Sequence, residues 1–243
     1  MSYKIITADS LVWLENHNDG SLGSFITGLP DMDEVNLNIE EYCIFFKKCA
    51  KLIFNKMSKN GYSIFIQTDR KINGSWFDKS YHLTNTAYEC GLKLMWHKIV
   101  LQRPVGHNHL QRPTYSHMLC YSYLSKPSVC FPDVIDIGKK EYKNSTPFTG
   151  SEECANFIMK AYKEDRPIID PFNGQGTIGL SVLKRGMNFI GIDIDPEQCK
   201  KCEEYLSKNL DKEKDSKGLE PSEVLKVLEP IKNNKLKLKF SKI

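Results

Sequence analysis

The amino-acid sequence predicts an α/β fold with a mostly parallel sheet and helices on both of its faces. Three observations support this prediction. An apolar strand at residues 167–170 runs into a glycine-punctuated turn, and the turn opens a helix. A second apolar strand follows at residues 189–195 and ends in acidic side chains. Upstream, short apolar segments alternate with segments of helical periodicity, as expected where helices connect parallel strands.

The length and composition of the chain are compatible with one α/β domain that carries additional segments. A chain of 243 residues is long enough to bury a core, and a net charge of +4 does not by itself indicate a nucleic-acid binder. The 8 cysteines are scattered, which favours reduced thiols and an intracellular location, cytoplasmic or nuclear. We expect no signal peptide and no membrane partner, because no apolar run approaches the roughly 18 residues of a membrane span.

In the first half of the chain, expected strands alternate with expected helices. The first strand ends at Asp9, and Ser10 can cap the helix that follows. Residues 68–76 form a polar loop with a glycine beside a tryptophan. The expected strands are 3–9, 24–27, 62–67 and 92–100, and the expected helices are 10–18, 39–57 and 80–90.

The second half contains a cationic loop, the glycine turn and a different terminal segment. Residues 102–113 have no periodicity, and two arginines and two histidines indicate an exposed cationic loop. Residues 211–243 are predicted to be a charged, lysine-rich extension of a domain at 1–210. This extension can follow a phosphate backbone or form a final strand with lysines toward solvent. The remaining expectations are strands at 116–123, 167–170 and 189–195, helices at 152–162, 196–210 and 219–228, and irregular structure at 126–149.

The turn after residue 170 has the composition of a nucleotide-binding site. Its glycines allow the backbone to approach a ligand without a Cβ in the way. The acidic residue at the end of the next strand, Asp193, can accept both hydroxyls of a ribose. A purely structural turn between strand and helix, or a site for another nucleotide, stays possible from these residues alone.

The full motif is Asp170-Pro-Phe-x-Gly-x-Gly-Thr177. It is more specific than a glycine turn alone, because a dinucleotide site does not require its acidic residue or its Pro-Phe pair. It resembles the cofactor-binding motif of S-adenosylmethionine-dependent amino-methyltransferases that act on nucleic-acid bases. The resemblance implies a Rossmann-like methyltransferase sheet and S-adenosyl-L-methionine as cofactor. It implies that Asp170 and the glycines hold the methionine end, that Phe172 packs beside the cofactor, and that Asp193 binds the ribose. The cofactor-binding residues implied are Asp9, Asp170, Pro171, Phe172, Gly174, Gly176, Thr177 and Asp193.

The order of the motifs resembles the circularly permuted class of these enzymes, in which the catalytic half precedes the cofactor half. Ala8-Asp9-Ser10 occupies the place of the first motif, which implies that Asp9 faces the adenine amine. A helix cap is the alternative role for Asp9. Gly28-Leu29-Pro30-Asp31 occupies the place of the catalytic tetrapeptide. The resemblance covers about residues 3 to 208 and is specific at 170–177 and 190–193.

The tetrapeptide departs from the family pattern, which reads Asp/Ser/Asn-Pro-Pro-aromatic. In the family, the first side chain and the next carbonyl accept hydrogen bonds from the target amine, and the aromatic ring stacks on a flipped base. Here Gly28 has no acceptor side chain and Asp31 has no stacking face. The predicted catalytic residues are therefore Gly28, Leu29, Pro30 and Asp31, with Asp31 as acceptor from a different angle. A turn residue after Pro30 is the alternative role for Asp31.

The cationic loop is the predicted nucleic-acid interface. Arg103 and Arg112 can hold phosphates, His107 lies between them, and Tyr115 offers a stacking surface. A solvated loop without a partner is the alternative. No metal site is expected, because Cys199 and Cys202 have no second pair at a suitable spacing.

These observations predict an S-adenosylmethionine-dependent methyltransferase acting on a base in RNA or DNA, with an exocyclic amine as favoured target. RNA is slightly favoured over DNA, because no large insertion offers a target-recognition domain. A protein partner that supplies recognition fits the same observation. Two alternatives stay open: a catalytically silent methyltransferase-like subunit of a complex, and a methyltransferase for a protein or a small molecule.

Overall fold

An eight-stranded sheet organises the first of two units into which the chain divides, Met1–Leu206 and Ser207–Ile243. The structure is a computed structural model, and it describes residues 1–124, 131–137 and 148–217. The strands of this sheet are β1 (Tyr3–Thr7), β2 (Phe25–Thr27), β3 (Ser63–Gln67), β6 (Lys93–Leu101), β7 (Tyr115–Ser122), β8 (Val134–Ile135), β9 (Ile168–Asp170) and β10 (Phe189–Asp193).

The order of the strands is β1-β10-β9-β2-β3-β7-β6-β8. All neighbours from β1 to β3 are parallel, whereas β7 runs antiparallel to β3 and to β6. The prediction of a mostly parallel sheet is confirmed. Because β10, β9, β2 and β3 run in the same direction, the turns that follow them meet at one edge of the sheet.

Strands β2 and β9 lie side by side, with Phe25 in register with Ile169. The Gly28–Asp31 segment follows β2 and the glycine turn follows β9, so two motifs far apart in the chain meet at that edge. The segment with the tetrapeptide precedes the glycine turn in the chain, as predicted. The interpretation of this order as a circular permutation stays a prediction.

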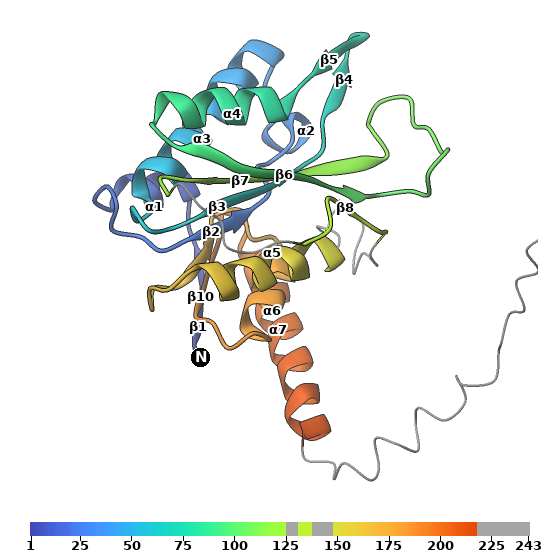
Figure 1. The fold of residues 1–243 in the computed structure, drawn as a ribbon. Helices are drawn as coiled ribbons and strands as arrows, with labels where there is room; N and C mark the ends of the chain where they lie inside the picture. The colour runs from blue at the N-terminus through green and yellow to red at the C-terminus, as the bar shows by residue number, and fades with distance from the viewer. Residues whose placement is uncertain (125–130, 138–147, 218–243) are drawn as a thin grey trace, which may run out of the picture. The chain divides into compact units, whose positions relative to one another are not determined.

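Helices cover both faces of the sheet, as predicted. Figure 1 shows α3 and α4 on one face and α5 and α6 on the other. The helices are α1 (Ser10–Glu15), α2 (Met32–Val35), α3 (Ile39–Lys56), α4 (Lys79–Glu89), α5 (Phe148–Ala161), α6 (Thr177–Leu183) and α7 (Pro196–Lys217). No helix among the described residues is long and apolar enough to cross a membrane.

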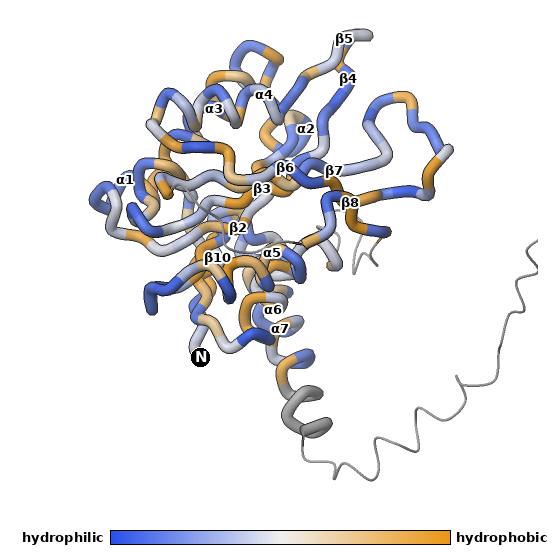
Figure 2. Tube along the Cα trace, viewed as in Figure 1, coloured by the Kyte–Doolittle hydropathy of each residue, from blue (hydrophilic) through white to orange (hydrophobic). Residues whose placement is uncertain are grey.

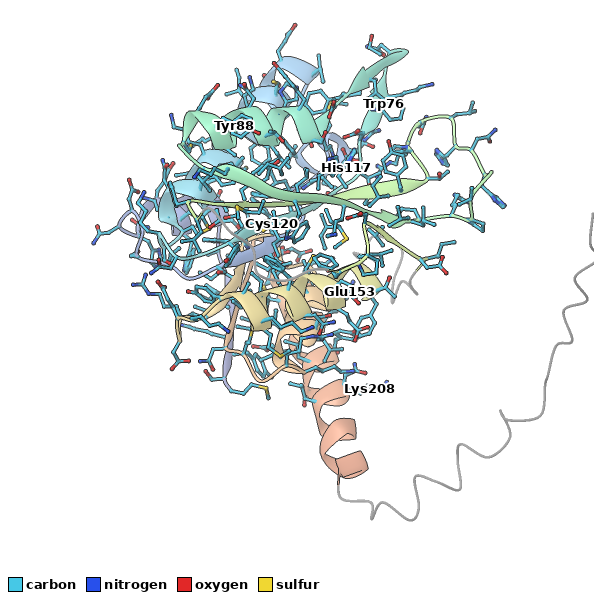
Figure 3. The ribbon with its side chains drawn as sticks, viewed as in Figure 1. Trp76, Tyr88, His117, Cys120, Glu153 and Lys208 are labelled. Atoms are coloured by element: carbon cyan, nitrogen blue, oxygen red, sulfur yellow. The ribbon has the colours of Figure 1, made fainter. Side chains whose placement is uncertain are left out.

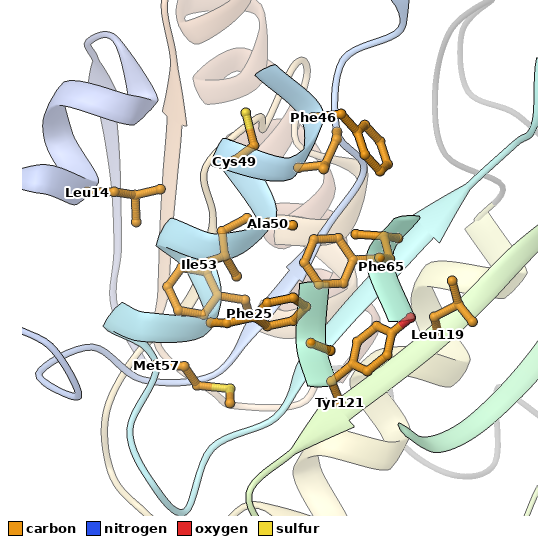
Figure 4. Packing of buried hydrophobic residues seen from close by; sticks show 14 of the residues in the cluster. Leu14, Phe25, Phe46, Cys49, Ala50, Ile53, Met57, Phe65, Leu119 and Tyr121 are labelled. Carbon is orange, nitrogen blue, oxygen red and sulfur yellow. The ribbon is translucent and has the colours of Figure 1, made fainter. Parts of the chain in front are cut away.

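The main core lies between α3 and the sheet. The apolar positions of α3 recur at helical spacing, so Phe46, Ile53 and their neighbours all reach the sheet. They pack against Phe65 of β3 and Tyr121 of β7, which are fully buried (Figure 4). Packing of α3 therefore fixes β2 and β3 as rigid supports for the segments that follow them.

The starts of two helices differ from the sequence prediction, one in its capping residue and the other in its position. Asp9, and not Ser10, caps α1, since its Oδ1 accepts from the backbone nitrogens of Leu11 (2.8 Å) and Val12 (3.1 Å). The prediction that Ser10 caps this helix is wrong, because the hydroxyl of Ser10 donates instead to the carbonyl of Pro171. Helix α5 starts at Phe148, earlier than the predicted residue 152.

Residues 68–76 were expected to form a loop, and this prediction is wrong. They contain β4 (Arg70–Ile72) and most of β5 (Ser75–Phe77), which pair as an antiparallel hairpin. Asn73 and Gly74 form its turn, both with positive φ, at 50° and 81°. Such a turn matches the twist of the two strands, and Asn-Gly is the dipeptide that favours it most.

Helix α7 continues to Lys217, beyond the predicted end near residue 210, because no proline or glycine interrupts its sequence. The expected helix at 219–228 and the rest of the terminal segment lie outside the described residues, as do parts of the irregular region at 126–149. The boundary of the predicted extension at residue 211 stays a prediction.

The core between α3 and β3 provides a test of the fold. Replacing Phe65 with Ala should lower the free energy of unfolding by about 3–5 kcal/mol, because the cavity left by a buried ring refills only in part. The control is Ile44→Ala on the outer face of α3, where the side chain is 69% exposed. Its effect should stay within about 0.5 kcal/mol. Urea denaturation followed by circular dichroism measures both values, and equal losses would contradict this packing.

Candidate active site

A cavity of about 990 Å³ opens at the edge of the sheet where β2, β3, β9 and β10 end. Its wall joins the glycine turn to the Gly28–Asp31 segment. Of the predicted residues, it includes Asp9, Gly28, Leu29, Pro30, Asp31, Arg112, Asp170, Phe172, Gly174, Thr177 and Asp193.

The glycine turn is held in shape by its own backbone and by α7. Gly176 has φ of 85° and begins α6, and a Cβ there would lie 2.5 Å from the sulfur of Cys202. The same sulfur accepts a hydrogen bond from Asn173 Nδ2 at 3.1 Å. Gly176 and Pro171 lie outside the cavity wall, so they shape the turn rather than line the cavity. Cys202 thus has a structural role.

Asp170 is a buried carboxyl group at the end of β9. Its Oδ1 accepts from Thr27 Oγ1 at 2.7 Å and from the backbone nitrogen of Phe172 at 3.1 Å. Its Oδ2 has no hydrogen-bond partner among the described residues. Burial raises the pKa of Asp170 from 3.8 to about 7, although the bonds from Thr27 and Phe172 oppose that shift. A cationic ligand in the cavity would favour the ionised form of Asp170, since its charge offsets the cost of burial.

Asp193 and Asp9 also face the cavity, and each holds local structure. Asp193 Oδ2 accepts from the backbone nitrogen of Gly174 at 2.8 Å, and Oδ1 accepts from that of Asp195 at 2.9 Å. A carboxylate oxygen has two lone pairs, so these bonds leave capacity for hydroxyl groups. Asp9 caps α1 through Oδ1, and Oδ2 has no partner among the described residues. Both residues can combine a structural role with ligand binding.

The carbonyl groups of the Gly28–Asp31 segment are fixed by side chains from other elements. Tyr42 of α3 donates its hydroxyl to the carbonyl of Pro30 at 2.9 Å. Gln67 of β3 donates Nε2 to the carbonyl of Leu29 at 3.3 Å. The segment therefore enters the cavity as a preorganised piece of backbone.

Asp31 is the centre of an ion-pair cluster. Arg112 Nη2 lies 2.6 Å from its Oδ2, Arg70 Nη1 lies 3.4 Å from the same oxygen, and Lys79 Nζ lies 3.2 Å from Oδ1. Asp31 also caps α2 in a capping box with Glu34. Burial raises the pKa of Asp31, but Lys79 and Arg112 outweigh it and hold the pKa below its usual value. Asp31 is thus a carboxylate occupied by cations and a weak proton acceptor.

Lys79 is a site residue that the sequence analysis missed. It begins α4, is only 2% exposed, and lines the cavity. Burial lowers its pKa, and Asp31 opposes that shift. Asp69 Oδ1 accepts from the backbone nitrogen of Lys79 at 2.9 Å and so positions the start of α4. No sequence signal points to Lys79, because its partner comes from a different part of the chain.

Asp69 also begins a hydrogen-bonded chain beneath the β4–β5 hairpin. Its Oδ2 lies 2.9 Å from His117 Nε2, and His117 Nδ1 lies 2.8 Å from His97 Nε2. Trp76 of β5 donates Nε1 to the same oxygen of Asp69 at 3.1 Å. Figure 3 shows Trp76 on the hairpin and His117 on the strand beneath it. This chain anchors the hairpin to the sheet.

The predicted nucleic-acid residues lie on or beside the loop at residues 102–114, between β6 and β7. Figure 2 shows this loop as mainly hydrophilic with short hydrophobic stretches. Arg103 and His107 are exposed on it, Arg112 reaches the cavity and binds Asp31, and Tyr115 begins β7 and packs on His117. The backbone nitrogen of Lys71 donates to the carbonyl of Gln111 at 2.9 Å, which joins the loop to the hairpin.

Further polar residues that sequence reasoning missed line the cavity on the β3 side. Gln102 Nε2 donates to Ser116 Oγ at 2.7 Å, and Ser116 also bonds to the hydroxyl of Thr68. Gln67 lies beside them at the end of β3. The cavity therefore has an acidic part around Asp9, Asp170 and Asp193 and a second part lined by amides, hydroxyls and cations.

Comparisons with known proteins agree with this geometry. The model of a protein family described as DNA methylase matches residues 151–204. This match includes the glycine turn and covers less than half of the chain. A comparison with curated proteins finds no match to the sequence.

Solved structures match over most of the chain. A candidate DNA modification methylase from Thermus thermophilus, solved with S-adenosyl-L-methionine, is 14% identical, with a TM-score of 0.65 over 85% of this chain and 93% of that chain. The PvuII DNA methyltransferase, described as cytosine-N4-specific, is 16% identical, with a TM-score of 0.64 over 83% and 85%. The M1.HpyAVI complex with its cofactor is 15% identical, with a TM-score of 0.57 over 84% and 98%.

The fold is the Rossmann-like fold of the methyltransferases. The family match covers the turn, and the turn forms one wall of a cavity with acidic groups at the predicted places. Together these findings support the prediction of an S-adenosylmethionine-dependent methyltransferase.

The raised pKa of Asp170 predicts pH-dependent cofactor binding. In its predicted role at the methionine end, Asp170 would pair with the ammonium group of S-adenosylmethionine, and only its carboxylate form could do so. Affinity should therefore be full above about pH 7 and fall up to tenfold per pH unit below it. Titration calorimetry from pH 5.5 to 8.5 measures this. Asp170→Asn should bind more weakly at pH 8 and lose the pH dependence, and an unchanged profile would contradict the assignment.

The same shift has the opposite sign for the stability of the free protein. Because the pKa of Asp170 is raised on folding, ionisation costs stability as the pH rises from about 4 to about 7. The melting temperature of Asp170→Asn relative to the original protein should therefore increase over that interval.

Proposed function

We propose that the protein transfers the methyl group of S-adenosylmethionine to an exocyclic amine of a base in nucleic acid. One observation carries the proposal: a single cavity joins the cofactor turn to the Gly28–Asp31 segment, and a cationic loop reaches its wall through Arg112. When bound, the cofactor supplies an electrophilic methyl group. The chain's residues then have to align the amine and the methyl group for in-line attack.

Positioning accounts for most of what this site can contribute. The bonds to the carbonyls of Leu29 and Pro30 fix the backbone beside the target before it binds. The pKa of Asp31 is low and its oxygens face cations, so we assign Asp31 to holding Lys79, Arg70 and Arg112 in place. In this proposal the amine loses its proton to solvent after attack.

The 102–114 loop is the proposed contact with the nucleic acid. Arg103, Arg112 and His107 come from a segment that contains no acidic residue, so phosphates meet no repulsion there. Val105 and Leu110 on the same loop are 87% and 90% exposed. Apolar side chains placed among cations in this way can contact bases while the cations hold phosphates. Tyr115 supports the loop from the sheet.

DNA is the first substrate to test, since the matched family and the similar structures are described as DNA methylases. The slight preference for RNA stays a prediction, as does a protein partner that supplies recognition. We propose an intracellular location, which the free cysteines among the described residues support.

A silent methyltransferase-like subunit is the second candidate, and the absence of an acceptor side chain at Gly28 favours it. Such a subunit would bind the cofactor without transferring its methyl group.

A methyl-transfer assay separates the two candidates. Cofactor labelled in its methyl group is incubated with the full chain and duplex DNA, single-stranded DNA or RNA, and the product nucleosides are analysed. We expect an N6-methyladenine or N4-methylcytosine product, and Asp170→Asn should reduce its amount. Cofactor binding without incorporation into any of these nucleic acids would support the silent subunit.

Arg103 tests the proposed interface without disturbing the ion pairs of Asp31, because Arg103 has no ion pair among the described residues. Replacing Arg103 with Ala should weaken duplex binding and reduce the slope of log K against log salt by about 1. Lys51→Ala on the outer face of α3 is the matched control and should leave the slope unchanged. Fluorescence anisotropy at several salt concentrations measures both, and equal slopes would contradict the interface.

A further inference from the structure

The proposed reaction needs a hydrogen-bond acceptor beside the target amine, and the Gly28–Asp31 segment does not offer one freely. Gly28 has no side chain, and the oxygens of Asp31 face Lys79, Arg70 and Arg112. The carbonyl of Leu29 already accepts from Gln67. The carbonyl of Leu29 keeps one lone pair, but a side-chain acceptor has to come from a neighbouring element, and this inference rests on the proposed function.

Gln67 lies beside the Gly28–Asp31 segment, at the end of the neighbouring strand β3. Strands β2 and β3 are parallel, with Thr27 in register with Phe65. The next residues, Gly28 and Ile66, are in contact, since a Cβ at Gly28 would lie 3.1 Å from the carbonyl oxygen of Ile66. Gln67 follows directly, is only 3% exposed, and contributes to the cavity wall. Gln67 therefore places its amide group in the cavity wall beside the Gly28–Asp31 segment.

The orientation of the amide group follows from its partner. The carbonyl of Leu29 can only accept a hydrogen bond, so the nitrogen of the amide must face it. Oε1 then points the other way, and it has no hydrogen-bond partner among the described residues. An amide oxygen that is held in place through its own nitrogen, and that has no partner among the described residues, can act as a preorganised acceptor in the cavity wall.

We propose that Gln67 Oε1 accepts a hydrogen bond from the target amine and aligns its lone pair with the methyl group. In the step, the nitrogen–methyl bond forms while the sulfur–methyl bond breaks, and the electron pair stays on sulfur. The methylated amine then releases its proton to water. The amide stays neutral throughout, so it acts by orientation and not as a base.

Other polar groups of this part of the cavity fit the role less well. Ser116 is bonded to both Gln102 and Thr68, which occupies its hydroxyl. Lys79 only donates hydrogen bonds. Gln67 alone combines contact with the Gly28–Asp31 segment, burial and an acceptor without a partner among the described residues.

The test uses Gln67→Met, which keeps the length of the side chain and removes both polar groups. At saturating substrates kcat should fall on the order of 10²-fold, the loss seen when one aligned hydrogen-bonding group is removed from an active site. Cofactor affinity should change less than twofold, since Gln67 faces the amine. Asn85→Ala is the control and should keep kcat, because Asn85 is a half-buried amide on α4, outside the cavity wall, that bonds to Glu89.

A rescue experiment separates an acceptor from a structural role. In the Gln67→Met background, Gly28→Ser returns an acceptor to the segment, and kcat should recover at least tenfold. If Gln67→Met keeps the original kcat, or if Gly28→Ser gives no recovery in a folded variant with normal cofactor binding, the inference is overturned. If the original protein methylates no nucleic acid at all, the proposed function fails first.

Discussion

The hydrogen bond from Thr27 to Asp170 holds together the two parts of the chain that make the site. It joins the end of β2 to the end of β9 at 2.7 Å, and both residues are buried. Without it, Oδ1 of Asp170 would lose one of two donors in a place that water does not reach. Because the two strands are neighbours, the same bond sets the distance between the glycine turn and the Gly28–Asp31 segment.

The ion-pair cluster around Asp31 does a comparable task on the other side of the cavity. Lys79, Arg70 and Arg112 come from α4, β4 and the 102–114 loop, and the carboxylate brings them together. Buried ion pairs add little net stability, because desolvation offsets their attraction. Their value here is positional, because they fix the β4 end of the hairpin and the 102–114 loop to the mouth of the cavity.

The sequence was sufficient for features that local chemistry decides. The glycine turn, the amphipathic α3 and the alternation of strands and helices along the chain follow from spacing and composition, and they are confirmed. The hairpin after β3 was missed even though Asn73-Gly74 is a turn signal, because each of its strands is only three residues long. The role of Asp31 was beyond the sequence for a different reason. Its pKa depends on Lys79 and Arg112, which only the folded chain places beside it.

The difference between local sequence and folded structure also bears on the departure of Gly28–Asp31 from the family pattern. A parallel pair of strands brings the residues after both strands to one edge, so an acceptor can come from either of them. Gly28, which follows β2, has no side chain that could act as an acceptor. Gln67, at the end of β3, contributes an amide to the same cavity wall. A sequence motif that covers only the residues after β2 does not include Gln67. The two positions are neighbours through the register of β2 and β3 and not through the sequence.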